Sequence, residues 1–552
     1  MMKKKILIIS ILTIFLIGTI SSSQAMNLKS ERNIEKTSTT INEELPSYFS
    51  WRDIDGVDFT TPVKNQAPFA SCETFALTAA LEVMVQKEVG YPFGCDLSEA
   101  HLYFFSGGNF DWGSYPENDT KVLVESGIPD EACWPYPKVR KVYPLNTTSP
   151  DWQQRVVKIK NWSYLPEDID AIKHALVNNG PVPTYFHSYL DFSYYKSGIY
   201  RHRWGKSSAP HYVCIMGYND DPGYWIVKNS WGTNYQDEGW FNIAYGECDI
   251  EKKSFYLNDV YGQFPILYVD DDNTAGPWDG SKEHPYQTIQ EGIDNAYEGY
   301  AVYVYNGTYN EKLIINKTVN LDGENRCNTI INGNGTGHVI EISEPNVRVS
   351  GFTIQNSGED PFDCGIKTLT LYSNVTIKNN IIQNNGIGVF LNYAYETTTD
   401  IVKDNIIQNN HEGIYSHWSD NNNIENNTIQ NNTGNGIDFE RSRYATITNN
   451  KIINNGGIGI LLGGFSNKNI IKSNFIENNG IGLNLELSHM NKISKNNFID
   501  NDKQAGFYNS FLNRWQRNHW NDWNKIRPKP ICGKIYRLPW RNYDFLHKRQ
   551  PY

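Results

Sequence analysis

Hydrophobic and polar residues repeat at a nearly constant interval through residues 265–525. An Asn-x-Ile core recurs at spacings of 25, 22, 23, 24 and 23 residues, beginning at Asn380, Asn405, Asn427, Asn450, Asn474 and Asn497. One unit of this length cannot bury its own apolar face, so the units must stack and share a continuous core. The pattern predicts a right-handed parallel β-helix, because the leucine framework of a leucine-rich-repeat horseshoe is missing.

The two ends of this repeat region have different patterns. Residues 286–296 have helical spacing, and we expect them to cap the open N-terminal edge of the stack. Residues 526–552 form a C-terminal tail, and this end of the chain is rich in Trp, Arg and Pro. We expect the tail to cover the other end.

Residues 47–262 follow a mixed pattern. Helical periodicity follows Cys72, and alternating apolar strands follow Pro210. This segment is expected to form one α+β domain, so the chain is predicted to be multidomain, with an α+β fold followed by a β-helix.

The N-terminus has the order of a secretory signal. Basic residues precede an apolar run, Ile6–Ile20, and a stretch of small residues follows it. We interpret residues 1–25 as a cleaved signal peptide. A lone membrane anchor is the alternative, but the run is shorter than the roughly 20 residues that a spanning helix needs. Residues 26–46 are polar and read as a short linker, so the protein is expected to be secreted or held at the cell surface.

Composition narrows the class of partner. The formal net charge of −11 leaves no basic footprint, which argues against nucleic acid. Aromatic residues make up 13% of the chain, too many for a disordered protein. We expect a monomer that needs no cofactor and no metal. Asp270-Asp271-Asp272 is read as a polar turn, with a calcium site as the alternative.

Cys72 has the setting of a nucleophile. A thiol that attacks an amide needs a thiolate, a proton donor for the leaving amine and hydrogen-bond donors for the oxyanion. Apolar residues at helical spacing follow Cys72 from Phe75 to Met84. Cys72 is therefore placed at a helix N-terminus, where free amides and the helix dipole favour a thiolate.

Three motifs make residues 47–262 resemble the papain (C1) family of cysteine peptidases. Gln66 stands six residues before Cys72, His211 opens an apolar strand, and Asn229 begins the motif Asn-Ser-Trp-Gly at the end of another strand. The resemblance implies a papain-like fold with Cys72 as nucleophile and His211 as its ion-pair partner and proton donor. It also implies that Asn229 holds the imidazole, and that Gln66 and the Cys72 N–H form the oxyanion hole.

The resemblance extends to the substrate side of the site. It implies that Trp231 shields the His–Asn hydrogen bond and that Gly113 and Ser114 lie where the substrate backbone binds. Cys95 and Cys133 flank a loop much as family disulfides do, which makes them a candidate disulfide.

Two positions depart from the family pattern. Glu73 stands where the family nearly always has Trp, and Phe69 replaces a cysteine that usually forms a disulfide. Packing around the nucleophile is therefore expected to differ from that of the family.

These motifs together indicate a secreted cysteine endopeptidase that acts on proteins or peptides, with a β-helix for surface or polysaccharide attachment. Two alternatives remain. One is a surface adhesin whose peptidase-like domain binds without cleaving, and the other is a polysaccharide lyase or epimerase activity in the β-helix. Several aromatic residues on the repeats are suited to stack on sugars or simply face solvent: Tyr393, Tyr395, Tyr415 and Trp418.

Overall fold

The computed structural model describes residues 45–109, 113–138, 149–235, 237–369, 373–394 and 399–552. The signal peptide predicted for residues 1–25 and nearly all of the linker predicted for residues 26–46 lie outside these ranges. Within them, no helix is both long enough and apolar enough to cross a membrane.

A six-stranded sheet organises residues 47–262. Its pairings are antiparallel except for the parallel pair β4–β7. The strand order is β1 (Tyr48–Ser50), β5 (Ser207–Asn219), β6 (Tyr224–Lys228), β7 (Trp240–Ala244) and β4 (Ile199–Tyr200), and β3 (Val182–Tyr189) also pairs with β5. A separate antiparallel pair joins β2 (Val157–Tyr164) to β8 (Phe255–Gly262).

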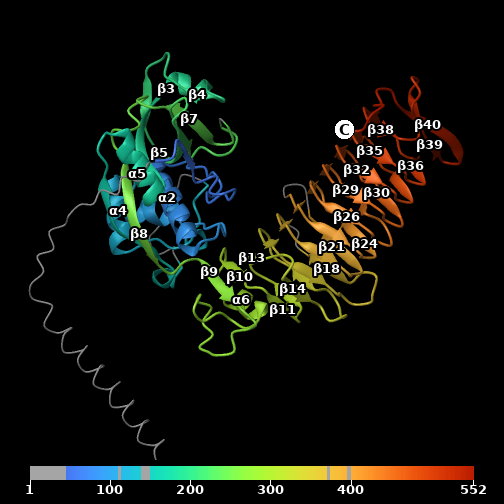
Figure 1. The fold of residues 1–552 in the computed structure, drawn as a ribbon, viewed down its shortest axis with the longest axis horizontal. Helices are drawn as coiled ribbons and strands as arrows, with labels where there is room; N and C mark the ends of the chain where they lie inside the picture. The colour runs from blue at the N-terminus through green and yellow to red at the C-terminus, as the bar shows by residue number, and fades with distance from the viewer. Residues whose placement is uncertain (1–44, 110–112, 139–148, 236, 370–372, 395–398) are drawn as a thin grey trace, which may run out of the picture. The chain divides into compact units, whose positions relative to one another are not determined.

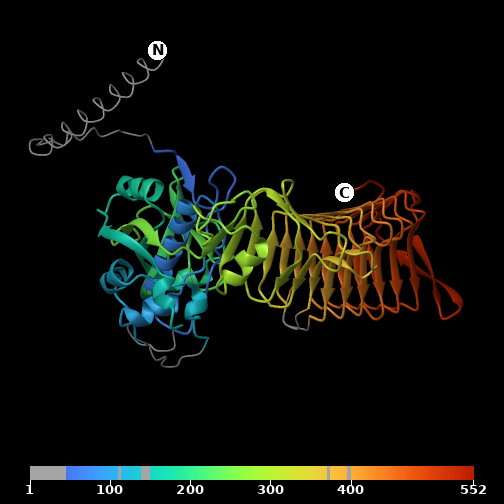
Figure 2. The same ribbon diagram turned by 90° about the horizontal axis from the view of Figure 1, so that it is seen from below.

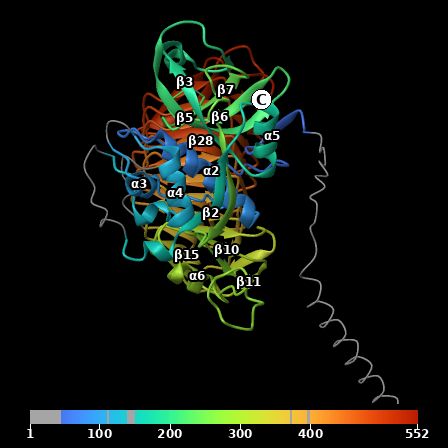
Figure 3. The same ribbon diagram turned by 90° about the vertical axis from the view of Figure 1, so that its left-hand side faces the viewer.

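The helix that follows Cys72 is α2 (Cys72–Val89), as the apolar spacing predicts. It is buried from Thr74 to Gln86, and Figure 3 shows it among the other elements of this half, near β5 and β6. The helix ends at Gly90, which has φ 82° and satisfies the last carbonyls from a left-handed conformation. Three further α-helices lie in the described part of this half: α3 (Glu99–Phe105), α4 (Pro116–Glu125) and α5 (Ile169–Asn178).

Residues 266–544 form a parallel β-solenoid in which the chain visits three sheets in turn (Figures 1 and 2). The first sheet contains β9 (Ile266–Val269), β10 (Ala301–Val304), β13 (Asn320–Gly323), β16 (Arg348–Ser350), β19 (Thr376–Lys378), β22 (Ile401–Lys403), β25 (Asn423–Glu425), β28 (Thr446–Thr448), β31 (Ile470–Lys472), β34 (Lys492–Ser494) and β37 (Arg514–Gln516). The second contains β11 (Gly307–Tyr309), β14 (Thr329–Asn332), β17 (Thr353–Gln355), β20 (Ile381–Gln383), β23 (Ile406–Gln408), β26 (Thr428–Gln430), β29 (Lys451–Ile453), β32 (Phe475–Glu477), β35 (Asn497–Ile499) and β38 (His519–Trp520).

The third sheet has the longest strands. It contains β12 (Leu313–Ile315), β15 (Ile340–Ile342), β18 (Cys364–Thr368), β21 (Ile387–Asn392), β24 (Glu412–His417), β27 (Ile437–Glu440), β30 (Ile458–Gly463), β33 (Ile481–Glu486), β36 (Lys503–Tyr508), β39 (Lys529–Ile535) and β40 (Leu538–Asp544). All pairs in the three sheets are parallel except the hairpin β39–β40. The solenoid confirms the prediction of stacked repeats.

An internal column of isoleucines fills the core. Ile382, Ile407, Ile429, Ile452 and Ile476 are in register from coil to coil, and none is exposed. The column continues with Phe498, which pairs with Ile476.

A buried asparagine column runs beside the isoleucines. Each side chain donates from Nδ2 to the Oδ1 of the next asparagine at 2.9–3.2 Å, and the same Oδ1 accepts the backbone N–H of the asparagine before it. The members are Asn380, Asn405, Asn427, Asn450, Asn474, Asn496 and Asn518. The sequence prediction was wrong by one residue at the sixth position. Asn496 rather than Asn497 continues the column, because Phe498 and not Ile499 faces the core.

The two ends of the solenoid are closed differently. Helix α6 (Ile289–Asn295) lies within the segment predicted to be helical, and the Thr288 hydroxyl caps it by accepting from the Glu291 N–H. At the other end the tail does more than cover the last coil, since β39 and β40 extend the third sheet. The buried Asp544 carboxylate accepts the Nδ2–H of Asn518 at 3.0 Å and so terminates the asparagine column.

We expect Asn427→Ala to destabilise the solenoid by about 3 kcal/mol, because it leaves the buried donors of Asn405 and the carbonyl of Val402 without partners. The measurement is the denaturant midpoint of the solenoid, followed by circular dichroism. Gln408→Ala is the matched control, since Gln408 belongs to a half-exposed amide column and its loss should cost about 0.5–1 kcal/mol. Equal losses in the two variants would contradict the role given to the buried column.

Candidate active site

The Cys72 thiol is the first side chain of α2 and is partly exposed. Its Sγ donates to Glu73 Oε2 at 3.4 Å. Burial raises the pKa of Cys72 well above its ordinary value and the Glu73 carboxylate raises it further, while the backbone N–H of Tyr212 opposes both. That hydrogen bond places the thiol beside the residue that follows His211.

His211 lies on β5 and its ring is fixed by Asn229, which follows β6. The distance from His211 Nε2 to Asn229 Oδ1 is 2.8 Å, and both residues are buried. The Trp231 ring stacks on the imidazole with centroids 4.6 Å apart and an interplanar angle of 25°. Because Asn229 engages Nε2, the other ring nitrogen, Nδ1, is left to exchange a proton with a thiol. The structure therefore brings Asn229 and Trp231 into contact with the His211 ring.

Burial favours the neutral forms of both reacting groups. It lowers the pKa of His211 to about 4, although the hydrogen bond to Asn229 opposes this shift. Together with the raised pKa of Cys72, this favours a resting site with a protonated thiol and a neutral imidazole. The ion pair that the resemblance implies stays a prediction, and burial together with the acidic neighbour Glu73 opposes it.

Gln66 is oriented by the strand-end motif that also carries Asn229. Gln66 Oε1 accepts from Ser230 Oγ at 2.7 Å, and the Gln66 backbone N–H donates to the Ser230 carbonyl at 2.8 Å. The acceptor end of the amide is thereby occupied, and Nε2 donates to the Phe69 carbonyl oxygen at 3.3 Å. The role of Nε2 as a donor for an oxyanion stays a prediction. Ser230 orients the Gln66 side chain only once the chain has folded. The one sequence feature that pointed to Ser230 was its position directly after Asn229.

Gly113 and Ser114 lie beside the nucleophile loop. Gly113 has φ 77°, and a Cβ there would meet the Ala70 carbonyl oxygen at 2.5 Å and Glu73 Oε2 at 3.5 Å, so only glycine fits. Ser114 turns its hydroxyl inward to Asp119 Oδ2 at 2.8 Å. The structure thus brings this segment to the nucleophile, as the resemblance implies.

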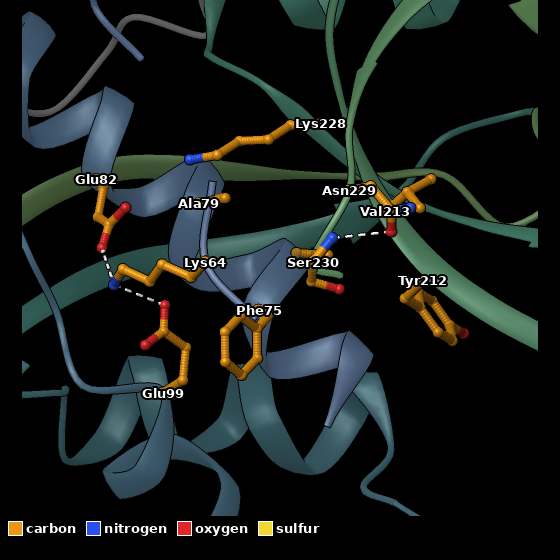
Figure 4. Close-up of a pocket in the computed structure, with 11 residues that line it drawn as sticks. Lys64, Phe75, Ala79, Glu82, Glu99, Tyr212, Val213, Lys228, Asn229 and Ser230 are labelled. Atoms are coloured by element: carbon orange, nitrogen blue, oxygen red, sulfur yellow. Dashed lines mark hydrogen bonds and ion pairs between the residues drawn. The ribbon is translucent and has the colours of Figure 1, made fainter. Parts of the chain in front are cut away.

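A buried charge network supports the oxyanion side of the site (Figure 4). The Lys64 ammonium lies 2.8 Å from Glu82 Oε1 and 2.8 Å from Glu99 Oε1, and it also pairs with Asp96 at 2.6 Å. Burial opposes the charge on Lys64, but the three carboxylates outweigh it and raise the pKa of Lys64 well above its ordinary value. These contacts hold the segment that leads to Gln66 against α2 and α3.

The same network reaches the strand that precedes Asn229. Lys228 Nζ donates to Thr61 Oγ1 at 2.8 Å, and Thr61 in turn donates to Glu82 Oε2 at 2.5 Å. Sequence reasoning did not find this network. A signal was present in Glu82, a carboxylate within an otherwise apolar helical run.

The candidate disulfide between Cys95 and Cys133 is not formed, and all eight cysteines are free thiols. Cys95 packs in the hydrophobic core of residues 47–262, whereas Cys133 Sγ contacts Asp130 Oδ2 at 3.8 Å. Phe69, which replaces a family cysteine, fills its place by packing on Tyr103, Phe104 and Tyr136.

Comparisons with known proteins found similarities in both parts of the chain. A model of the papain family of cysteine proteases matches residues 45–258, and a model described as periplasmic copper-binding protein (NosD) matches residues 293–533. Cysteine proteinase 2 of Entamoeba histolytica is 32% identical over 247 residues, which cover 42% of this chain and 76% of the relative. Cathepsin S of Bos taurus is 28% identical over 41% of this chain and 71% of the relative. Among solved structures, the bromelain protease of Ananas comosus is 26% identical over 39% of this chain and 99% of that chain, with a TM-score of 0.34.

The residues of the solenoid do not fit a copper site. Copper prefers imidazole, thiolate and thioether ligands. Among the described residues, the one group of three possible ligand side chains within 4.8 Å is Asp270, Asp271 and Asp272, which lies before residues 293–533. Asp270 and Asp271 already accept backbone N–H groups of Asp272 and Thr308, as expected of a polar turn.

We expect Glu73→Gln to lower the pKa of the Cys72 thiol by about one unit, because it removes a negative charge next to the thiolate. Burial raises the pKa of Glu73 to about 7, so the carboxylate is ionised above that pH and the two proteins should differ most there. The measurement is the pH dependence of alkylation of Cys72 by iodoacetamide. Glu117→Gln, an exposed carboxylate on α4, is the control. An unchanged profile in Glu73→Gln would rule out this coupling.

Proposed function

The chain belongs to the papain family of cysteine proteases, and from this membership we propose that it is a secreted endopeptidase working through a Cys72 thiolate and His211. The observation that carries the proposal is the fixed imidazole, with His211 Nε2 held 2.8 Å from Asn229 Oδ1 while Cys72 begins α2. The sequence of residues 1–25, with its basic start and apolar run, supports export.

The proposed reaction moves one proton between thiol, imidazole and leaving group. The Cys72 proton passes to His211 Nδ1, and the thiolate attacks the carbonyl carbon of the scissile peptide bond. The negative charge that forms on the carbonyl oxygen is stabilised by Gln66 Nε2–H and the Cys72 backbone N–H. When the carbon–nitrogen bond breaks, His211 gives its proton to the leaving amine and leaves a thioester. Water, deprotonated by His211, then hydrolyses the thioester and restores the thiol.

The substrates proposed for this site are proteins and peptides. Gly113 packs against the Ala70 carbonyl oxygen, which a Cβ would meet at 2.5 Å, so this segment can approach the nucleophile loop closely. Trp231 covers the imidazole from the opposite element and excludes water from the His211–Asn229 hydrogen bond. The joint placement of Gln66, Cys72, His211 and Asn229 argues against a purely adhesive domain, since binding alone does not need all four.

For the solenoid we propose attachment to a surface or a polysaccharide. Tyr393 and Trp418 are exposed on neighbouring coils, and the Arg441 guanidinium lies 4.8 Å over the Trp418 ring. Tyr415 is half-buried and donates from its hydroxyl to Glu440 Oε2 at 2.9 Å. Aromatic faces flanked by such polar groups are suited to sugar rings. Tyr395 lies outside the described residues.

A polysaccharide lyase or epimerase activity is the second candidate, and a carboxylate pair favours it. Glu412 Oε2 accepts the Asn435 backbone N–H at 2.9 Å, and Asp438 Oδ2 accepts from Asn435 Nδ2 at 3.0 Å, so the two carboxylates flank one residue. Burial raises the pKa of Glu412 to about 7 and that of Asp438 to about 6. Such values suit general acid–base chemistry near neutral pH. The sequence alone did not reveal this pair.

We expect Cys72→Ala to lower the hydrolysis of denatured casein by at least about 1,000-fold, because no other group supplies the nucleophile. A thiol-alkylating agent should stop the wild-type reaction and label Cys72. Cys327→Ala is the control, since Cys327 is an exposed thiol of the solenoid and its loss should leave the activity unchanged. Full activity of Cys72→Ala would refute the peptidase proposal.

We expect the full chain carrying Cys72→Ala to bind acidic or neutral polysaccharides on a glycan array. Adding Trp418→Ala should weaken binding about tenfold, roughly 1.4 kcal/mol, by removing one stacking face. Trp204→Ala, an exposed tryptophan of residues 47–262, should leave binding unchanged. Silence on the array would remove the polysaccharide proposal, and unsaturated sugar products would favour the lyase candidate.

A further inference from the structure

The C-terminal segment, residues 526–552, carries a charge opposite to that of the chain. It contains seven Lys and Arg residues and one acidic residue, Asp544, whereas the whole chain has a formal net charge of −11. Asp544 is fully buried and bonded to the last coil. The Lys and Arg side chains of this segment, except the buried Lys529, are exposed, and the segment exposes no carboxylate side chain.

The same segment exposes large apolar side chains. Ile526 is 88% exposed, Leu538 71% and Phe545 70%, and Tyr536, Trp540 and Leu546 are more than half exposed as well. The end of a solenoid normally needs a polar outer face to stay soluble. Apolar groups gathered at such an end indicate a surface that contacts something.

The hairpin β39–β40 explains why these side chains lack a cover. Side chains alternate along a strand, so Leu538 and Trp540 lie on the same face of β40 as the buried Asp544. On β39 that face holds Ile531, which packs in the solenoid core. Leu538 and Trp540 therefore continue the core-facing side of the third sheet beyond the last coil. Figure 2 shows this hairpin, in red, at the end of the stack of coils.

The edge of β40 is poorly suited to pairing with another strand. Pro539 removes a backbone donor from the strand, and Arg537 and Arg541 place charges beside it. Two copies that met through this hairpin would also bring like charges together. The exposed apolar groups thus need a partner that is neither a further strand nor a second copy.

A basic hollow lies between the residues that flank the hairpin and the last coils of the solenoid. Its volume is about 690 Å³, and cations and apolar groups line it together: Arg517, Lys548 and Arg549 with Ile526, Phe545 and Leu546. A site that binds a free anion needs only cations. In this hollow, apolar side chains lie beside the cations.

We propose that residues 526–552 dock on the surface of an anionic lipid bilayer. Lys and Arg side chains bind the anionic headgroups, Trp540 and Tyr536 suit the interface, and Ile526, Leu538 and Leu546 enter the acyl boundary. An anionic polysaccharide or a nucleic acid would satisfy the charges but would offer no apolar phase for the last three side chains. The inference is independent of the peptidase activity and of glycan binding by the coils.

The test measures sedimentation of the full chain with vesicles of phosphatidylcholine alone and of phosphatidylcholine mixed with phosphatidylglycerol. We expect binding to the mixed vesicles, at least tenfold weaker binding to the neutral ones, and loss of binding as salt is raised. Lys548→Gln and Arg549→Gln, at side chains that line the hollow with Leu546, should each weaken binding about fivefold. Leu538→Ser combined with Trp540→Ser should abolish it at low salt.

Tyr194→Ser combined with Trp204→Ser is the matched control, because both are exposed aromatic side chains of residues 47–262. It should bind vesicles like the wild type. Circular dichroism and the unfolding midpoint establish that the hairpin variants are folded. The proposal is overturned by equal binding to neutral vesicles, by no binding to either kind, by a concentration-dependent dimer that the hairpin variant loses, or by tighter binding to polygalacturonate than to the mixed vesicles.

Discussion

A buried side-chain amide that donates and accepts hydrogen bonds at once is the interaction on which both halves of this protein depend. In the solenoid, each column asparagine accepts two hydrogen bonds and donates two, and the column passes from coil to coil up to Asp544. In the other half, Asn229 accepts from Ser230 N–H and holds His211, while Ser230 holds Gln66. An unpaired amide in either place would cost about 1–3 kcal/mol, so each amide permits one arrangement of its neighbours.

The exclusion of water that makes these buried amides need partners also shifts the pKa values of Cys72 and His211. Burial penalises the Cys72 thiolate and the His211 imidazolium, and Glu73 adds a further penalty to the thiolate. The helix N-terminus acts in the opposite direction with about 0.3–1 kcal/mol. Both pKa shifts favour the neutral pair, so burial and Glu73 oppose the charge separation that the proposed reaction needs.

The stability of a solenoid comes from contacts between neighbouring coils. The first and the last coil each lack one neighbour, so each end needs a cap of its own. Helix α6 closes one end with a capped turn, and Asp544 closes the other by accepting from Asn518 and Trp520. Asp544 terminates the polar column and Ile531 packs in the core, so the structural contacts of the hairpin are made by its buried residues. Its cations and apolar side chains can therefore serve contacts outside the chain.

The comparison of sequence and structure separates two kinds of information. Repeat spacing gave the stacked coils, the isoleucine core and most of the asparagine column, because each coil makes the same local choice of strand and turn. The motifs around Gln66, Cys72, His211 and Asn229 gave the candidate site, because the order and the flanking residues were specific. The choice between Asn496 and Asn497 required the structure, since either could follow the repeat and only the direction of Phe498 decides.

What the sequence by itself determined is therefore whatever depends on residues close together along the chain: the period of the coils, the helix that begins at Cys72 and the strand-end motif of Asn229. The tertiary structure alone decided what depends on distant elements. It left Cys95 and Cys133 as free thiols, gathered Lys64, Glu82 and Glu99, and set Glu412 and Asp438 about Asn435. Spacing carries no information on these contacts or on the resulting pKa shifts, because burial and charge sum over every element that packs around a group.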